Sequence, residues 1–183
     1  MRKTVVHLFT IADYEEEEIW LRRQHNNGWK LVKMIPPVFY VFESCEPEDV
    51  IYRLDYKNAD PIDEFRQMAA DFGWEYITQC TGWLYFRKPA ADAETEGEEE
   101  LFSDPASRAE MAEHVVRTRL LPITGIFLCC VIPNLLNAVR GVMGSFSGFF
   151  TGFFGFMFVI YVANILHCGF KLKAIRDRYR GRE

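Results

Sequence analysis

The sequence predicts an α+β domain followed by a hairpin of two membrane-spanning helices, and three observations carry this prediction. The first 89 residues contain two similar segments in which β-rich runs alternate with amphipathic helical runs. Two later runs, residues 120–139 and 146–170, hold no Asp, Glu, Lys or Arg. Residues 90–104 carry seven acids and no Lys or Arg, which is typical of a solvated, flexible linker.

The overall composition supports a folded chain with two different parts. With 49% hydrophobic residues and a net charge of −5, the chain is too apolar and too weakly charged for a disordered protein. Residues 105–183 carry 10 Lys and Arg against 4 Asp and Glu, whereas residues 1–89 are acidic overall. Because cations are sparse in residues 1–89, we expect no binding of nucleic acid there.

An internal repeat organises the predicted domain, residues 1–89. At an offset of 45 residues, Gly28-Trp29 matches Gly73-Trp74, Trp20 matches Phe65, and Tyr40 matches Tyr85. Each copy predicts the order strand, helix, strand, strand, so the domain is a tandem β-α-β-β repeat. Two such units predict an antiparallel sheet with both helices on one face.

In the first copy, residues 4–10 form a β-rich run, and Asp13 is suited to begin a helix. The acids at 15–18 suit the positive end of that helix, where we expect them to be solvated rather than to bind a metal. Gly28 fits the helix end, because a residue without a Cβ atom tolerates the left-handed conformation. Strands are then predicted over residues 29–35 and 38–43.

The second copy repeats this order, beginning with a β-rich run over residues 50–56. Its helix is predicted from apolar residues at helical spacing, namely Ile62, Phe65, Met68, Ala69 and Phe72. Gly73 fits the end of this helix as Gly28 does in the first copy. Strands are predicted over residues 74–80 and 83–88.

The two uncharged runs are each long enough to cross a hydrocarbon core, which needs roughly 20 helical residues. Since only residues 140–145 separate them, they predict an antiparallel hairpin with both chain ends on one side. A juxtamembrane helix is expected over residues 105–119 and a basic tail over 171–183. Eight flanking cations against Arg140 in the loop place both ends in the cytoplasm.

The second run carries small residues four positions apart, at Gly144, Gly148 and Gly152. Such spacing lets another helix approach closely. The partner is either the first run of the same hairpin or the same face of a second copy, which would form a homodimer.

The sequence shows no catalytic motif. The four histidines are scattered, the five cysteines form no CxxC pair, and neither a phosphate-binding loop nor a zinc-protease motif occurs. We therefore expect a protein that is not an enzyme and that takes no metal and no cofactor.

Aromatic residues on the predicted strands are the candidate binding residues. Most of them are expected to be core beneath the helices, because every second side chain of a strand shares a face. The remainder would line a groove for a small lipophilic ligand, with Glu43, Glu75 or Arg53 as the polar contact. The candidates are Tyr52, Trp74, Glu75, Trp83 and Tyr85.

The runs EEIWLRRQHNNGWKLVKM, PPVFYVFE, VIYRLDY and DFGWEYITQCTGWLYFRKP resemble the bacterial domain of unknown function 2812 family over about residues 5–89. The resemblance implies a domain placed before membrane spans and often encoded beside PadR-type transcriptional regulators, and it assigns no catalytic residue. The tandem repeat also resembles gyrase-inhibitor-like domains, in which a groove with aromatic residues and a Glu accepts lipophilic cations.

These observations predict a non-enzymatic bacterial inner-membrane protein. Its cytoplasmic domain would bind a regulatory protein or a small lipophilic ligand and act as a sensor, with the lipid bilayer as the other partner. The alternative is a structural or accessory subunit of a membrane complex, assembled through the glycine-rich hairpin.

Overall fold

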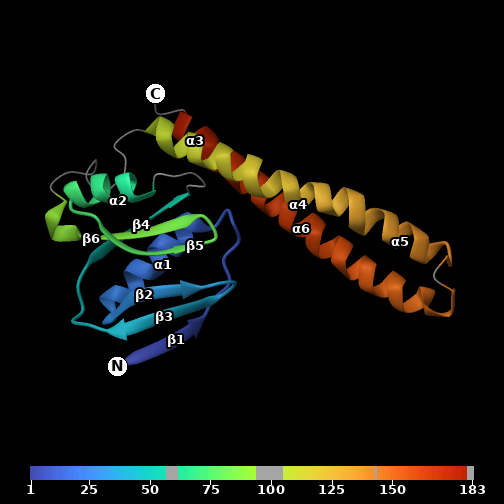
Figure 1. Ribbon diagram of the computed structural model, residues 1–183, viewed down its shortest axis with the longest axis horizontal. Helices are drawn as coiled ribbons and strands as arrows, with labels where there is room; N and C mark the ends of the chain where they lie inside the picture. Colours follow the sequence, from blue (N-terminus) through green and yellow to red (C-terminus); the bar gives the residue numbers. More distant parts are fainter. Residues whose placement is uncertain (57–61, 94–104, 143, 181–183) are drawn as a thin grey trace. The chain divides into compact units, whose positions relative to one another are not determined.

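The computed structural model describes residues 1–56, 62–93, 105–142 and 144–180 (Figure 1). The chain divides into two compact units, Met1–Met111 and Ala112–Glu183. Most of the predicted acidic linker, residues 94–104, lies outside the described residues.

The first unit is an α+β domain in which the predicted β-α-β-β order occurs twice. Its elements are β1 (Arg2–Val6), α1 (Tyr14–Asn26), β2 (Trp29–Ile35), β3 (Phe39–Ser44), β4 (Val50–Tyr56), α2 (Ile62–Asp71), β5 (Glu75–Cys80), β6 (Trp83–Pro89) and η1 (Ala90–Asp92). The first strand ends at Val6, earlier than predicted. Farther along, the Asp13 carboxylate accepts hydrogen bonds from the Thr10 amide at 2.8 Å and the Thr10 hydroxyl at 2.6 Å. These bonds turn the chain before α1 begins.

The strands form two three-stranded antiparallel sheets, in the orders β1-β3-β2 and β4-β6-β5. The central strand of each sheet is therefore the last strand of its repeat. The prediction of one continuous sheet is too simple. Strands β2 and β5 are neighbours in space, but among the described residues no ladder of hydrogen bonds joins them.

The prediction that both helices lie on one face is wrong, because α1 and α2 cover opposite faces of the second sheet. Tyr85 and Phe86 are consecutive on β6, so their side chains point to opposite faces. The Tyr85 hydroxyl donates to Glu17 of α1, whereas the Phe86 ring packs on Phe65 of α2. Since Tyr40 of β3 also donates to Glu17, α1 lies between the two sheets (Figure 1).

Turn length explains why Tyr85 faces α1 rather than the helix of its own repeat. The β2–β3 turn has three residues and the β5–β6 turn has two, so β6 follows β3 at an offset of 44 residues rather than 45. Tyr85 therefore matches Val41, and Tyr40 matches Leu84. A shift of one residue moves a strand side chain to the other face, which is why the two tyrosines meet at one helix.

Burial on both faces makes the second sheet the core of the domain. The cluster beneath α2 consists of Ile51, Phe65, Ala69, Trp74, Leu84 and Phe86, each at most 6% exposed. Full burial of one large apolar side chain stabilises the fold by roughly 1.5–3 kcal/mol.

Both helices of the domain end at glycines in the left-handed region, as predicted. The φ angle is +80° at Gly28 and +81° at Gly73. A Cβ atom at Gly28 would lie 3.1 Å from the Cys45 carbonyl oxygen, so this position has little space as well.

The second unit is a helical hairpin. It contains the end of α3 (Pro105–Val115), which begins in the first unit, followed by η2 (Val116–Leu120), α4 (Leu121–Ile126), η3 (Phe127–Val131), α5 (Ile132–Val139), η4 (Gly144–Phe146) and α6 (Ser147–Arg180). The stretches η2 and η3 are π-helical, and each precedes a proline, Pro122 or Pro133, whose ring and missing N–H disturb the regular ladder. The α6 helix continues through most of the predicted basic tail.

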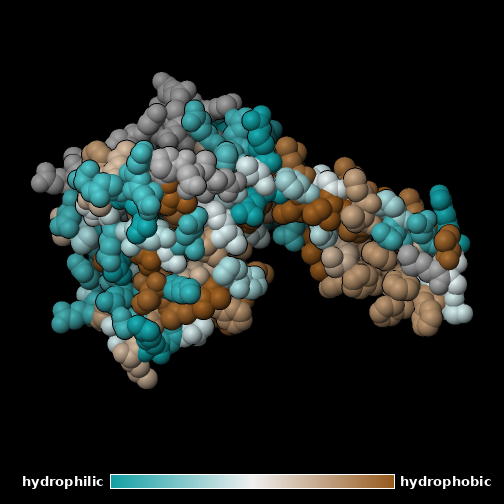
Figure 2. All heavy atoms as spheres, viewed as in Figure 1, coloured by the Kyte–Doolittle hydropathy of each residue, from teal (hydrophilic) through white to brown (hydrophobic). Residues whose placement is uncertain are grey.

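The two helical runs pack antiparallel. The Phe127 ring lies 5.3 Å from the Phe158 ring and 5.9 Å from the Tyr161 ring, as centroid distances. Two helical spans, Glu110–Val139 and Gly144–Tyr179, are long and apolar enough to cross a membrane. Figure 2 shows hydrophobic side chains along these helices.

Candidate functional site

The predicted aromatic groove is not open in the described structure. Tyr52, Trp74, Trp83 and Tyr85 are each at most 8% exposed. Trp74 belongs to the cluster beneath α2, whereas the other three lie on the sheet face toward α1. Glu75 is exposed, so the carboxylate and the aromatics do not line a common groove. The ligand-binding role of these residues stays a prediction.

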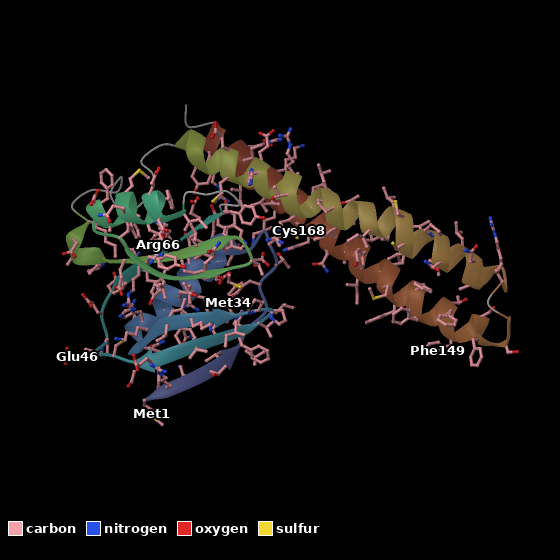
Figure 3. The ribbon with its side chains drawn as sticks, in the orientation of Figure 1. Met1, Met34, Glu46, Arg66, Phe149 and Cys168 are labelled. Carbon is pink, nitrogen blue, oxygen red and sulfur yellow. The ribbon has the colours of Figure 1, made fainter. Side chains whose placement is uncertain are left out.

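An open cleft of about 270 Å³ is lined by Glu75, one of the predicted residues, and by His25, whose Nδ1 lies 2.8 Å from the Tyr52 hydroxyl. We call it the charged cleft. Figure 3 labels Glu46, one of its residues, on the connection from β3 to β4, at the other end of β2 from Met34. Its ionisable lining residues are His25, Lys30, Cys45, Glu46, Glu48, Glu75 and Arg87, with Val50 and Pro89 completing it.

A bidentate ion pair forms one wall of the charged cleft. Arg87 and Glu75 lie opposite each other on β6 and β5, and two guanidinium nitrogens each lie 2.7 Å from a carboxylate oxygen. The hydrogen bonds from Arg87 lower the pKa of Glu75. This geometry fixes the guanidinium at the cleft wall.

A short chain of hydrogen bonds orients His25 at the cleft. The Leu31 amide donates to the Tyr52 hydroxyl at 3.3 Å, and that hydroxyl lies 2.8 Å from Nδ1 of His25. We infer that Tyr52 donates to Nδ1, which places the ring hydrogen on Nε2 as a donor for the cleft. Burial, together with the charges of Arg87 and Lys30, lowers the pKa of His25 to about 4, so the ring is neutral at pH 7.

A second polar centre lies on α1, away from the cleft. Oε1 of Glu17 accepts a hydrogen bond from the Tyr40 hydroxyl at 2.8 Å and one from the Tyr85 hydroxyl at 2.7 Å. Burial raises the pKa of Glu17 to about 7, and the charges of Glu18 and Asp13 act in the same direction. One carboxyl group therefore joins α1 to both sheets.

The prediction that residues 15–18 are solvated is wrong for two of the four acids. Glu17 and Glu18 are each 6% exposed. Oε1 of Glu18 accepts the Leu54 amide of edge strand β4 at 2.8 Å, and its Oε2 lies 3.3 Å from a guanidinium nitrogen of Arg53. The acid run thus supplies buried structural contacts. The described residues contain no group of three or more metal-ligating side chains.

The predicted helix-packing glycines face away from the first helical run. A Cβ atom built at Gly144, Gly148 or Gly152 would meet no atom within 4 Å. The described structure therefore does not use them for packing inside the hairpin, and the homodimer alternative stays a prediction.

The sequence patterns do not identify Glu17, His25 or Arg87 as site residues. A run of four consecutive acids is longer than the positive end of a helix requires, and this excess was the sequence signal that could have identified Glu17. Arg87 can be identified as the partner of Glu75 only when the register of β5 and β6 is known. That register contains a bulge, which a repeat pattern in the sequence does not predict.

A family model described as "Protein of unknown function (DUF2812)" matches residues 13–124, from the start of α1 into α4. No curated protein and no solved structure matches the chain.

Proposed function

The chain belongs to the DUF2812 family, and on that premise we propose that it is a non-enzymatic protein of the bacterial inner membrane that binds a ligand or regulatory protein through its α+β domain. The family description names no activity, so the proposal rests on geometry. The observation that carries it is the exposed apolar surface of the two long helices.

That surface distinguishes these helices from core helices of a soluble protein. In the most apolar 18-residue windows, only 11% of the first span and 0% of the second is buried. A core helix would be mostly covered by protein, whereas a helix in lipid needs no such cover. Both helices exceed the roughly 20 residues that a hydrocarbon core of about 30 Å requires.

The distribution of cations supports a cytoplasmic domain. The outer ends of the hairpin carry Arg117, Arg119 and the Lys and Arg residues from 171 onward, whereas the short connection between its two runs carries Arg140 alone. Loops rich in Lys and Arg stay on the cytoplasmic side.

Membrane extraction and reporter fusions test this part of the proposal. We expect the full chain to stay with membranes after an alkaline carbonate wash. A fluorescent protein fused after Glu183 should fold, and alkaline phosphatase fused after Arg140 should be active outside the cytoplasm. Release of the chain by carbonate would refute the membrane assignment, and the reversed reporter pattern would refute the orientation.

The charged cleft changes the proposed ligand from lipophilic to charged. Lys30, Arg87 and the N–H of His25 suit an anionic group, and the carboxylates of Glu46 and Glu48 suit a cationic group. The structure therefore favours a small ligand, or a segment of a regulatory protein, that carries both charges.

A thermal unfolding screen of the full chain in detergent tests the cleft. We would use zwitterionic amino acids and small peptides, since a ligand at one hundred times its dissociation constant adds about 2.7 kcal/mol of stability. Arg87→Gln should abolish a hit. Arg66→Gln, which alters an exposed ion pair with Asp63 on α2, is the matched control. A hit that Arg87→Gln leaves unchanged would place the ligand elsewhere.

The open glycine face favours a second candidate function, a subunit of a membrane complex. Gly148 and Gly152 of α6 leave space that no atom of the described chain fills. Leu at both positions should abolish association of the chain in membranes, measured by crosslinking. Gly125→Leu, at an open position of α4, is the control. Unchanged association in the double variant would argue against this second function.

A further inference from the structure

Four cations border the apolar surface of the helical hairpin on both of its runs. Arg117 and Arg119 lie in η2, and Lys171 and Lys173 lie in α6. We call these four residues the basic collar. Arg117 and Lys173 are exposed, whereas Arg119 and Lys171 are half-buried.

The packing of the hairpin brings the two halves of the collar to one level. A Cβ atom at Gly169 would lie 3.9 Å from Cδ2 of Leu120, so these two residues face each other. The helices run antiparallel, and the collar residues lie one to four positions beyond this contact on each run. All four cations therefore fall within about one helical turn.

Acidic residues lie farther from the apolar surface than the collar does. In the described part of the two helical runs they are Glu110, Glu113 and Asp177, which lie ten, seven and eight positions beyond the contact of Leu120 with Gly169. The carboxylate of Asp177 lies 3.0 Å from the Arg176 guanidinium. The collar is thus a concentration of positive charge directly beside apolar surface.

The apolar residues next to the collar are also exposed. Leu121 follows Arg119 by two positions and is 58% exposed, and Phe170 precedes Lys171 and is 70% exposed. A ligand that fits this order of surfaces carries a negative group followed by hydrocarbon. Anionic phospholipids have this chemistry, and cations near an anionic membrane surface each contribute about 1 kcal/mol of binding.

We propose that the basic collar binds the phosphate group of anionic phospholipids, with Leu121 and Phe170 in contact with their acyl chains. The proposal rests on the membrane location proposed above. It adds that the hairpin selects lipids by headgroup charge at its cytoplasmic end.

Native mass spectrometry of the full chain in neutral detergent tests this selection. Phosphatidylglycerol and phosphatidylcholine with the same acyl chains are titrated separately, so that a difference in affinity reports headgroup charge. We expect tighter binding of phosphatidylglycerol. Arg117→Gln with Lys173→Gln should lower its affinity by roughly 25-fold, because each of the two cations is worth about fivefold, and should leave the affinity for phosphatidylcholine unchanged.

The matched control is Arg140→Gln with Arg178→Gln, which removes the same charge outside the collar. This control should leave the preference for phosphatidylglycerol unchanged. Equal binding of the two lipids, or an equal loss in both double variants, would overturn the proposal. Displacement of phosphatidylglycerol by excess inorganic phosphate would also overturn it, since the site would then recognise a free anion. Loss of preference in a variant that keeps wild-type thermal unfolding supports it.

Discussion

At the residue scale, the least expected feature is a carboxyl group held between two sheets. Glu17 accepts hydrogen bonds from Tyr40 of the first repeat and Tyr85 of the second. These partners lie 23 and 68 residues away in sequence, so no local pattern predicts the contact. Glu17 therefore joins the two repeats through one carboxyl group, and its burial in this position favours the protonated form.

Glu17→Gln should change how stability depends on pH. Because burial raises the pKa of Glu17 from 4.5 to about 7, the folded protein keeps a proton that the unfolded chain releases in that range. The stabilising contribution is complete below pH 4.5 and is lost as pH rises to about 7. At pH 8 the variant should exceed the wild type by on the order of 2–3 kcal/mol in the free energy of unfolding.

Urea unfolding followed by tryptophan fluorescence measures this effect in the full chain, since all four tryptophans lie in the α+β domain. Glu16→Gln alters an exposed neighbour and is the control. Parallel pH profiles for wild type and Glu17→Gln would contradict the assignment.

His25 should act in the opposite direction. Burial, with the charges of Arg87 and Lys30, lowers its pKa from 6.5 to about 4, so its stabilising contribution is present above pH 6.5 and is lost as pH falls toward 4. His25→Gln should therefore reduce the loss of stability in acid, as measured by the same urea titrations. His114→Gln, at an exposed histidine of α3, is the control. If both variants unfold in acid like the wild type, the neutral buried state of His25 is wrong.

At the element scale, the sequence predicts which helices and strands exist better than where they pack. Periodicity and the two glycines identify each repeat, because these signals are local. The match of Tyr40 with Tyr85 is off by one residue of turn length, so Tyr85 faces α1 while Phe86 faces α2. The predicted groove is filled for the same reason, since α1 covers the face that carries Tyr52 and Tyr85.

Alanine substitution at the two helix-ending glycines should give unequal losses. Both positions have φ near +80°, where an L-residue costs roughly 1–2 kcal/mol. Gly28→Ala should lose more, because its Cβ would lie 3.1 Å from a backbone oxygen, whereas at Gly73 the nearest atom is Cε of the flexible Lys88 side chain at 3.5 Å. Urea unfolding of both variants measures the difference. A larger loss for Gly73→Ala would show that space at Gly28 does not limit stability.

At the scale of the whole molecule, the two units are built for different surroundings. The domain buries aromatic and aliphatic side chains on both faces of its second sheet, whereas α6 exposes phenylalanines along much of its length. The family match extends from α1 into α4, so it includes the beginning of the apolar helical run together with the domain. This two-part organisation is predictable from sequence, because unbroken apolar runs of such length are rare in soluble domains.

Residues 1–93 should therefore fold without the hairpin. The core beneath α2 is formed by residues 51–86, and its last packing partners are Ala90 and Ala93. The Ala90 amide donates to the Asp49 carbonyl at 2.9 Å, which fixes the end of the domain. We expect the truncated chain to be soluble, to unfold cooperatively in urea, and to show the same pH dependence through Glu17 as the full chain. Aggregation, or a non-cooperative transition, would show that the domain needs residues beyond 93 for its stability.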